Sequence, residues 1–172
     1  QKAVKTAAEL KANDFVTFKA DATLAETAAT PLTGGTNGTV ENAAYQTYLD
    51  RIEPYTFHAM GCASANEIIK GLFAAFTKRM RDECGVKFQT VLFRYAKADY
   101  EGVISVENGL NGAETDSSMI YWTTGAEAGC AVNKSLTNTV YTGEYDVYAD
   151  YTQTQLEEAV KKGKLMFHKV DD

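Results

Sequence analysis

The chain has 172 residues, of which 45% are hydrophobic and 23% charged, and its formal net charge is −6. This length allows one well-buried domain, and the composition is typical of a globular protein rather than of a disordered or membrane-spanning chain. Basic residues are scattered, which argues against a nucleic-acid-binding surface, and no apolar run approaches the roughly 20 residues of a membrane span.

The N-terminal part predicts a strand followed by a glycine-rich connector. Residues 14–20, DFVTFKA, alternate with the period of two that is typical of a strand. Residues 30–40, TPLTGGTNGTV, place three glycines just before a predicted helix. A stretch of this kind can form a phosphate loop, a hinge or a turn.

The glycine spacing favours a turn or hinge over a phosphate site. A Walker loop requires Lys and then Ser or Thr directly after its last glycine, whereas Gly38 is followed by Thr39 and Val40. The dinucleotide pattern G-x-G-x-x-G is absent as well, and Glu41 would repel a phosphate at the start of the next helix. Asn37 and Gly38 instead form a strong turn signal.

Helices and strands alternate in the centre of the chain. A capping-box pattern at Ser64–Glu67 begins one of the helices. The predicted elements are a helix over 42–53 that Pro54 stops, a strand over 55–62, a helix from Ser64 to Gly85, and strands over 86–93 and 102–106. This alternation requires a parallel sheet with crossover helices. The predicted fold class is α/β, with a mixed, mainly parallel sheet flanked by helices and a short β-rich N-terminal lead-in.

Two more helices and a closing strand are predicted towards the C-terminus. Residues 115–132 predict a helix whose many small residues allow close packing on the sheet. Residues 137–151, with four tyrosines, predict an extended and partly exposed segment. A second capping box, Thr152–Gln155, begins a short helix that ends at Gly163. Residues 164–170 predict the last strand.

No catalytic, cofactor-binding or metal-binding residues are predicted. His58 lies in a predicted strand and His168 alternates within the last one, so both are expected to be packed or rim side chains. Ser135 stands in a plausible loop, but no G-x-S-x-G pattern marks a nucleophile. An α/β hydrolase that uses Ser135 and His58 is the alternative hypothesis. Cysteines and neighbouring carboxylates show neither metal-ligand nor acid/base spacing.

The charged residues and the cysteines are ordinary for a globular protein, whereas the number of aromatic residues is unusual. The basic cluster 78–81 is followed by Asp82 and Glu83, which predicts a solvated helix face with local charge compensation. The three cysteines lack CxxC spacing and predict reduced, mostly buried thiols in a protein made in cytoplasm. Ten tyrosines and one tryptophan favour an assembling protein, with half-buried packing as the alternative.

Four long strings match one family in the same order and cover about residues 5–170. They read TPLTGGTNGTV, FAAFTKRMRDECGVKFQTVL, ADYEGVISVENG and GAEAGCAVNKSLTNTVYTGEYDV. On these strings the chain resembles the contractile tail sheath proteins of bacteriophages and prophages, in particular those of Gram-positive prophages and of their defective-phage or bacteriocin particles.

The resemblance implies a domain organisation and a structural role. Residues 1–35 would form the end of a preceding β-rich region and a linker. Residues 36–172 would form the central α/β domain, which is subtilisin-like in shape and without protease activity. Subunits of this family stack around an inner tube and contract to drive it through a cell envelope, and they use no cofactor.

The resemblance also implies partners and a location. The expected partners are other sheath subunits and the inner tail tube protein, with no nucleic acid and no membrane. The expected location is the tail sheath of the virion, after synthesis in the host bacterial cytoplasm. The chain begins with Gln1 rather than Met, and the family locks together through terminal arms. We therefore expect a fragment that is monomeric on its own.

Overall fold

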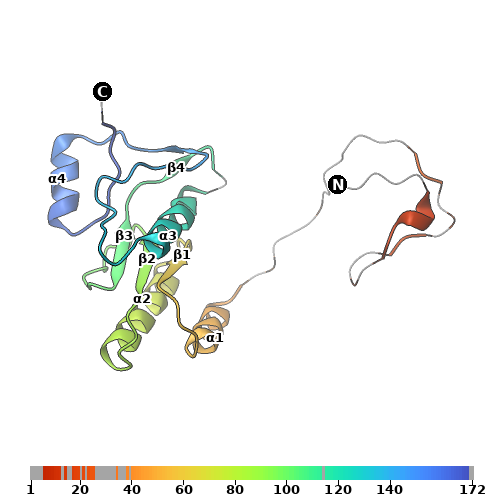
Figure 1. Ribbon diagram of the computed structural model, residues 1–172, viewed down its shortest axis with the longest axis horizontal. Coiled ribbons are helices and arrows are strands. Elements are labelled where there is room, and N and C mark those ends of the chain that lie inside the picture. Colours follow the sequence, from red (N-terminus) through yellow and green to blue (C-terminus); the bar gives the residue numbers. More distant parts are fainter. Residues whose placement is uncertain are drawn as a thin grey trace. The chain divides into compact units, whose positions relative to one another are not determined.

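The computed structural model describes residues 6–12, 14, 17–19, 21, 23–25, 34, 38, 40–113 and 115–170. The chain divides into two compact units, residues 1–39 and 40–172 (Figure 1). In the first unit a short 3-10 helix, η1, spans Ala7–Glu9. Residues 15, 16 and 20 of the predicted strand over 14–20, and most of the glycine stretch 30–40, lie outside the described residues. Within them, 17–19 form no strand, and Gly34 has a φ of 81°, which favours glycine.

A three-stranded parallel sheet forms the centre of the second unit. Its strands are β1 (Ala59–Cys62), β2 (Gln89–Phe93) and β3 (Val103–Val106), in the order β1-β2-β3. In Figure 1 the strands lie side by side, with α4 beyond β3 and α1 on the side of β1. A small antiparallel pair, β4 (Leu110–Asn111) with β5 (Asp146–Val147), is separate from this sheet. The predicted mixed, mainly parallel α/β fold is confirmed.

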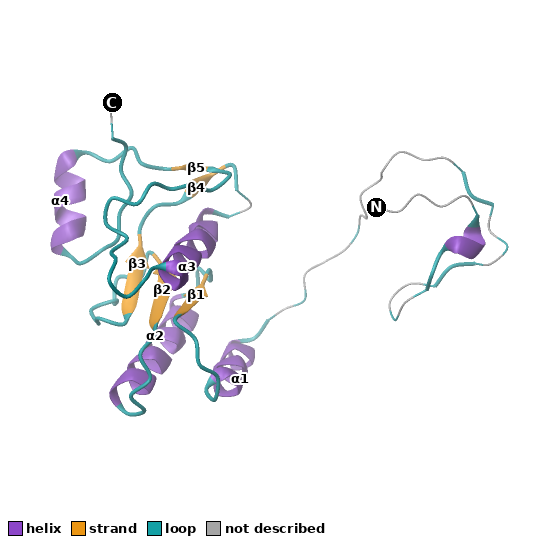
Figure 2. Cartoon of the chain, in the orientation of Figure 1, coloured by secondary structure: helices purple, strands orange, loops and turns teal. Residues whose placement is uncertain are grey.

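Helices cover both faces of the parallel sheet (Figure 2). Helices α1 (Asn42–Ile52) and α2 (Glu67–Asp82) share one apolar core with Met60 and Leu92. Helix α3 (Met119–Gly129) contributes to a second core with Val91 and Val106. Side chains alternate between the two cores along β2, so the strand is buried on both sides, as is typical of parallel sheets.

The start of α2 differs from the predicted capping box. The side chain of Asn66, not of Ser64, accepts the orphan N–H of Ile68 at 2.9 Å, while Ser64 Oγ accepts the N–H of Asn66. The Glu67 carboxylate bonds to Lys70 instead of reaching back to the cap. The predicted end is confirmed, because Gly85 has a φ of 71° and the N–H of Val86 donates to the Met80 carbonyl.

The predicted strands are longer than the observed ones. Residues 55–58 and 86–88 are loops, although Phe57 and Phe88 pack with ring centroids 4.6 Å apart and Phe88 is buried. An apolar run predicts burial, but it does not distinguish a ladder from a buried loop. Both strands therefore begin several residues later than predicted.

Close packing between α3 and the sheet depends on a glycine of β1 and not, as predicted, on the small residues of the helix. The helix is shorter than predicted and follows a 3-10 turn, η2 (Asp116–Ser118). Its small residues Gly125 and Gly129 face open space. On β1, however, a Cβ built on Gly61 would overlap the side chain of Thr124 and come within 3.0 Å of Ile120. The strand glycine, not the helix glycines, permits the close approach.

The C-terminal part is held to the sheet by backbone hydrogen bonds at Leu165 and by side chains. Helix α4 (Gln153–Lys161) begins with the predicted capping box of Thr152 and Gln155, which is confirmed. The predicted strand over 164–170 is reduced to one parallel bridge between Val106 and Leu165. Beyond it, the buried Asn108 side chain donates to the carbonyls of Tyr148 and Phe167, each at 2.8 Å, and accepts the Phe167 N–H at 2.7 Å.

Candidate interaction surface

The carboxyl ends of the parallel strands are the usual ligand site of an α/β domain. In this chain the protein's own side chains fill part of that position. Lys70 is 3% exposed, and its ammonium group donates to Glu67 at 2.5 Å and to the Arg94 carbonyl at 3.4 Å. The Ser105 hydroxyl accepts the N–H of Tyr95 and donates to the Glu107 carboxylate, both at 2.9 Å. These bonds tie the ends of β2 and β3 to α2.

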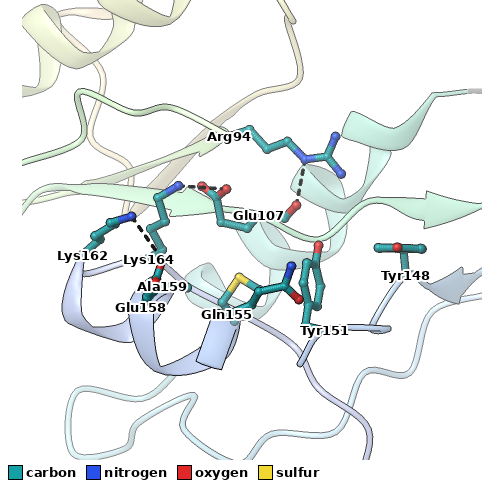
Figure 3. A pocket seen from close by; sticks show the side chains of 10 residues that line it. Arg94, Glu107, Tyr148, Tyr151, Gln155, Glu158, Ala159, Lys162 and Lys164 are labelled. Atoms are coloured by element: carbon teal, nitrogen blue, oxygen red, sulfur yellow. Dashed lines mark hydrogen bonds and ion pairs between the residues drawn. The ribbon is translucent and has the colours of Figure 1, made fainter. Parts of the chain in front are cut away.

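A shallow hollow of about 430 Å³ lies beside this network, between β3 and α4 (Figure 3). The Arg94 Nε donates to the Glu107 carbonyl at 2.9 Å, and the Glu107 carboxylate pairs with Lys164 at 3.0 Å. Lys162, which directly follows α4, has its ammonium nitrogen 3.7 Å from the carboxylate of Glu158 on that helix. The charged side chains that line the hollow thus have partners, and the Lys164–Glu107 pair fastens the C-terminal segment to the end of β3.

The residues of the hydrolase hypothesis have other partners. The Ser135 hydroxyl bonds to the Thr137 hydroxyl at 2.8 Å and accepts the N–H of the same residue. His58 is exposed just before β1, and its carbonyl accepts the N–H of Gln89. No hydrogen bond joins Ser135 to a histidine within the part of the chain that the structure describes. His168 is exposed, and its ring bonds to the Lys169 carbonyl. Nothing here supports a hydrolase.

The described residues hold no group of three or more His, Cys, Asp or Glu side chains placed to bind a metal ion. None of their helices has the length and apolarity that crossing a bilayer requires.

The basic cluster of α2 is less solvated than predicted. Arg79 binds the Glu53 carboxylate at 2.6 and 3.3 Å, and this hydrogen-bonded pairing holds the pKa of Glu53 below its ordinary value. The side chain of Arg81 is 11% exposed and bonds to Glu101 at 2.9 Å and to the Phe88 carbonyl at 2.8 Å. The compensating carboxylates come from other elements rather than from the next two residues in sequence. Such distant partners leave no local signal in the sequence.

The cysteines differ in accessibility, which corrects the prediction that most are buried. Cys62 is buried in β1, Cys84 is exposed and Cys130 is half-buried, and all three are free thiols. Burial raises the pKa of the Cys62 thiol. A thiol that is both inaccessible and protonated reacts slowly.

We therefore expect alkylation of the native chain to follow exposure. Iodoacetamide should modify Cys84 first and Cys130 more slowly, and Cys62 should react only when denaturant unfolds the domain. Peptide mass spectrometry over a time course measures the three rates. Modification of native Cys62 as fast as Cys84 would contradict the described burial.

An apolar groove opens where the C-terminal segment meets the loop after α3. Its lining includes Trp122, whose ring centroid lies 5.0 Å from that of Tyr141 and 5.6 Å from that of Phe167. Val140 and Val160 also line it and are 77% and 69% exposed. Apolar side chains left uncovered in this way are typical of surfaces that bind other polypeptide. Three of the chain's many aromatic residues, Trp122, Tyr141 and Phe167, line this groove.

These observations define a mixed α/β domain with an apolar groove on its surface. Residues 38–172 match the family described as the phage tail sheath protein central domain. The match covers most of the chain, and the chain belongs to this family.

Individual relatives agree with this assignment. The chain is 36% identical to the uncharacterized protein YqbK and 35% identical to the phage-like element PBSX protein XkdK, both of Bacillus subtilis, over 95% of its own length. Two solved structures of sheath tail proteins are similar. The structure from Desulfitobacterium hafniense has a TM-score of 0.74 and a sequence identity of 42%, and it covers 96% of this chain. The structure from Listeria innocua has a TM-score of 0.69 and a sequence identity of 33%, and it covers 95% of this chain. The chain spans about two-fifths of the length of these relatives.

Proposed function

We propose that the chain is the central domain of a contractile sheath subunit that polymerises around an inner tube and contracts to drive the tube through a cell envelope. The observation that carries the proposal is the family match over residues 38–172. The sheath tail structures, similar over nearly the whole chain, support it. In this proposal residues 1–35 end a preceding β-rich region and residues 36–172 form the central domain.

The proposed role is structural and involves no catalysis or cofactor. Its support is the carboxyl end of the sheet, where buried Lys70 and the Glu107–Lys164 pair take up positions that a substrate would need in an α/β enzyme. A network of this kind stabilises strand ends and leaves them unavailable for chemistry.

The proposed partners are further copies of the subunit and the inner tail tube protein. We place the assembled protein in the virion tail sheath, made in the host bacterial cytoplasm, with neither nucleic acid nor membrane as a partner. The net charge of −6 supports this, because a phosphate backbone repels an acidic surface. Uncovered apolar side chains such as Val140 supply surface for contacts between polypeptides.

Electron microscopy of the full-length parent protein tests the proposal. Negative staining should show hollow tubes or stacked rings, whereas the 172-residue chain should sediment as a monomer. Full-length protein that stays monomeric under all conditions would contradict the sheath role. A helical polymer formed by the 172 residues alone would contradict the monomer prediction. Full-length Ser135→Ala serves as a control that should assemble as the wild type does.

A further inference from the structure

Strand β1 ends the parallel sheet on the side away from β3. The N–H of Gln89 donates to the His58 carbonyl at 3.1 Å, and β1 pairs with β2 from Ala59↔Gln89 onwards. Because backbone groups alternate in direction along a strand, those of Met60 and Cys62 point towards β2. The N–H and C=O groups of Ala59 and Gly61 therefore point outward, and the described residues provide no hydrogen-bond partner for them.

The composition of β1 is that of an interior strand. Its sequence, Ala-Met-Gly-Cys, has no charge and no proline. Met60 and Cys62 are 6% and 5% exposed on one face, and α3 packs over Gly61 on the other. Gly61 is nevertheless exposed, because its backbone edge is open. Natural edge strands are protected by charges, prolines or bulges, by a covering helix or loop, or by being very short. Strand β1 is short, with four residues, but it has no charge, proline or bulge.

We infer that, in the full-length sheath subunit, a strand from the same polypeptide but outside these 172 residues pairs with β1. The inference rests on the proposed function, since the length of the sheath relatives supplies the occupant. This chain spans about two-fifths of their length, so each has ample further polypeptide. Its family is described as a central domain, which places sequence on both sides of it.

A strand in cis fits the chemistry of this edge better than one from a second copy. In a free subunit an open, uncharged edge would pair with any exposed strand that it meets. Pairing within the subunit removes that hazard. The added strand would bond to the outward groups of Ala59 and Gly61 and lie between the layers that contain α2 and α3.

Amide hydrogen exchange, measured residue by residue with NMR, tests the inference on the 172-residue chain and the full-length subunit kept below its assembly concentration. The amides of Ala59 and Gly61 should exchange about 100-fold more slowly in the full-length monomer than in the shorter chain. The amides of Met60 and Cys62, which face β2, should be protected in both and serve as internal controls. Equal exchange of Ala59 and Gly61 in the two chains would overturn the inference.

Two further outcomes separate the alternatives. Protection of Ala59 and Gly61 that appears only after assembly would overturn the cis strand and assign the edge to a neighbouring copy. The sheath proposal is judged separately by microscopy of the same full-length sample. If tubes form while the edge amides exchange fast, the inference fails and the sheath function stands.

A proline variant gives an independent readout. Ala59→Pro removes an outward N–H and leaves the ladder between β1 and β2 intact, whereas Met60→Pro removes an inward N–H. Ala59→Pro should lower the melting temperature of the full-length subunit more than that of the 172-residue chain, and Met60→Pro should destabilise both. An equal loss in the two chains for Ala59→Pro would contradict a partner strand.

Discussion

Replacing Asn108 with alanine is expected to lower the free energy of unfolding by about 3 kcal/mol or more. The side chain is fully buried and makes three hydrogen bonds to the backbone, two of them with Phe167 and one with Tyr148. Alanine leaves these partly buried backbone groups without that partner, and an unsatisfied group costs about 1–3 kcal/mol where it is buried. Urea unfolding followed by circular dichroism measures the loss.

A neighbouring asparagine provides the control for this prediction. Asn111 lies in β4 with an exposed side chain, so Asn111→Ala should change stability by less than about 0.5 kcal/mol. Exchange of the Phe167 amide should also become faster in Asn108→Ala, because that amide loses its acceptor. Equal stability of the two variants would show that Asn108 does not anchor the C-terminal segment.

Substitution of Gly61 by alanine should cost about 1–3 kcal/mol, the usual range for overpacking a core contact. The new methyl group would overlap the Thr124 side chain and press on Ile120, so α3 would have to move away from β1. Thermal unfolding measures the change. The matched variant Gly125→Ala places a methyl group in open space on the same helix and should stabilise by up to about 1 kcal/mol, because alanine favours a helix.

A double variant identifies the cause of that loss. Thr124→Ala removes the side chain that the new methyl group would meet, so Gly61→Ala combined with Thr124→Ala should recover part of the stability. A purely additive double variant would mean that the cost arises from the backbone of β1 and not from contact with α3.

Periodicity in the sequence was sufficient to predict the α/β class. Helix α2, with buried side chains such as Phe73 and Met80, lies within the predicted range, and Gly85 ends the helix as expected. The predicted strand starts are too early, because the half-buried Phe57 and the buried Phe88 lie in loops and look the same in sequence as ladder residues. Capping was ambiguous at Ser64 because Asn66, two residues later, is an equally good cap.

The surfaces were harder to predict because their partners are distant in sequence. Arg79 and Arg81 pair with Glu53 and Glu101, which the chain brings close only after it folds. The open edge of β1 follows from strand order, and a four-residue apolar strand has the same sequence whether it lies inside a sheet or at its end. The family resemblance supplied a function that neither periodicity nor residue spacing indicated.

The attachment of the C-terminal segment has a mechanical consequence. Leu165 runs parallel to β3, and the bonds of Asn108 and the Lys164–Glu107 pair lie beside it. A pull on the chain at residue 170, directed along β3, would load these bonds together in shear instead of opening them one after another. Bonds that share a load resist more force than the same bonds broken in sequence. The segment is therefore attached in a geometry that resists a pull along β3 better than a pull across it.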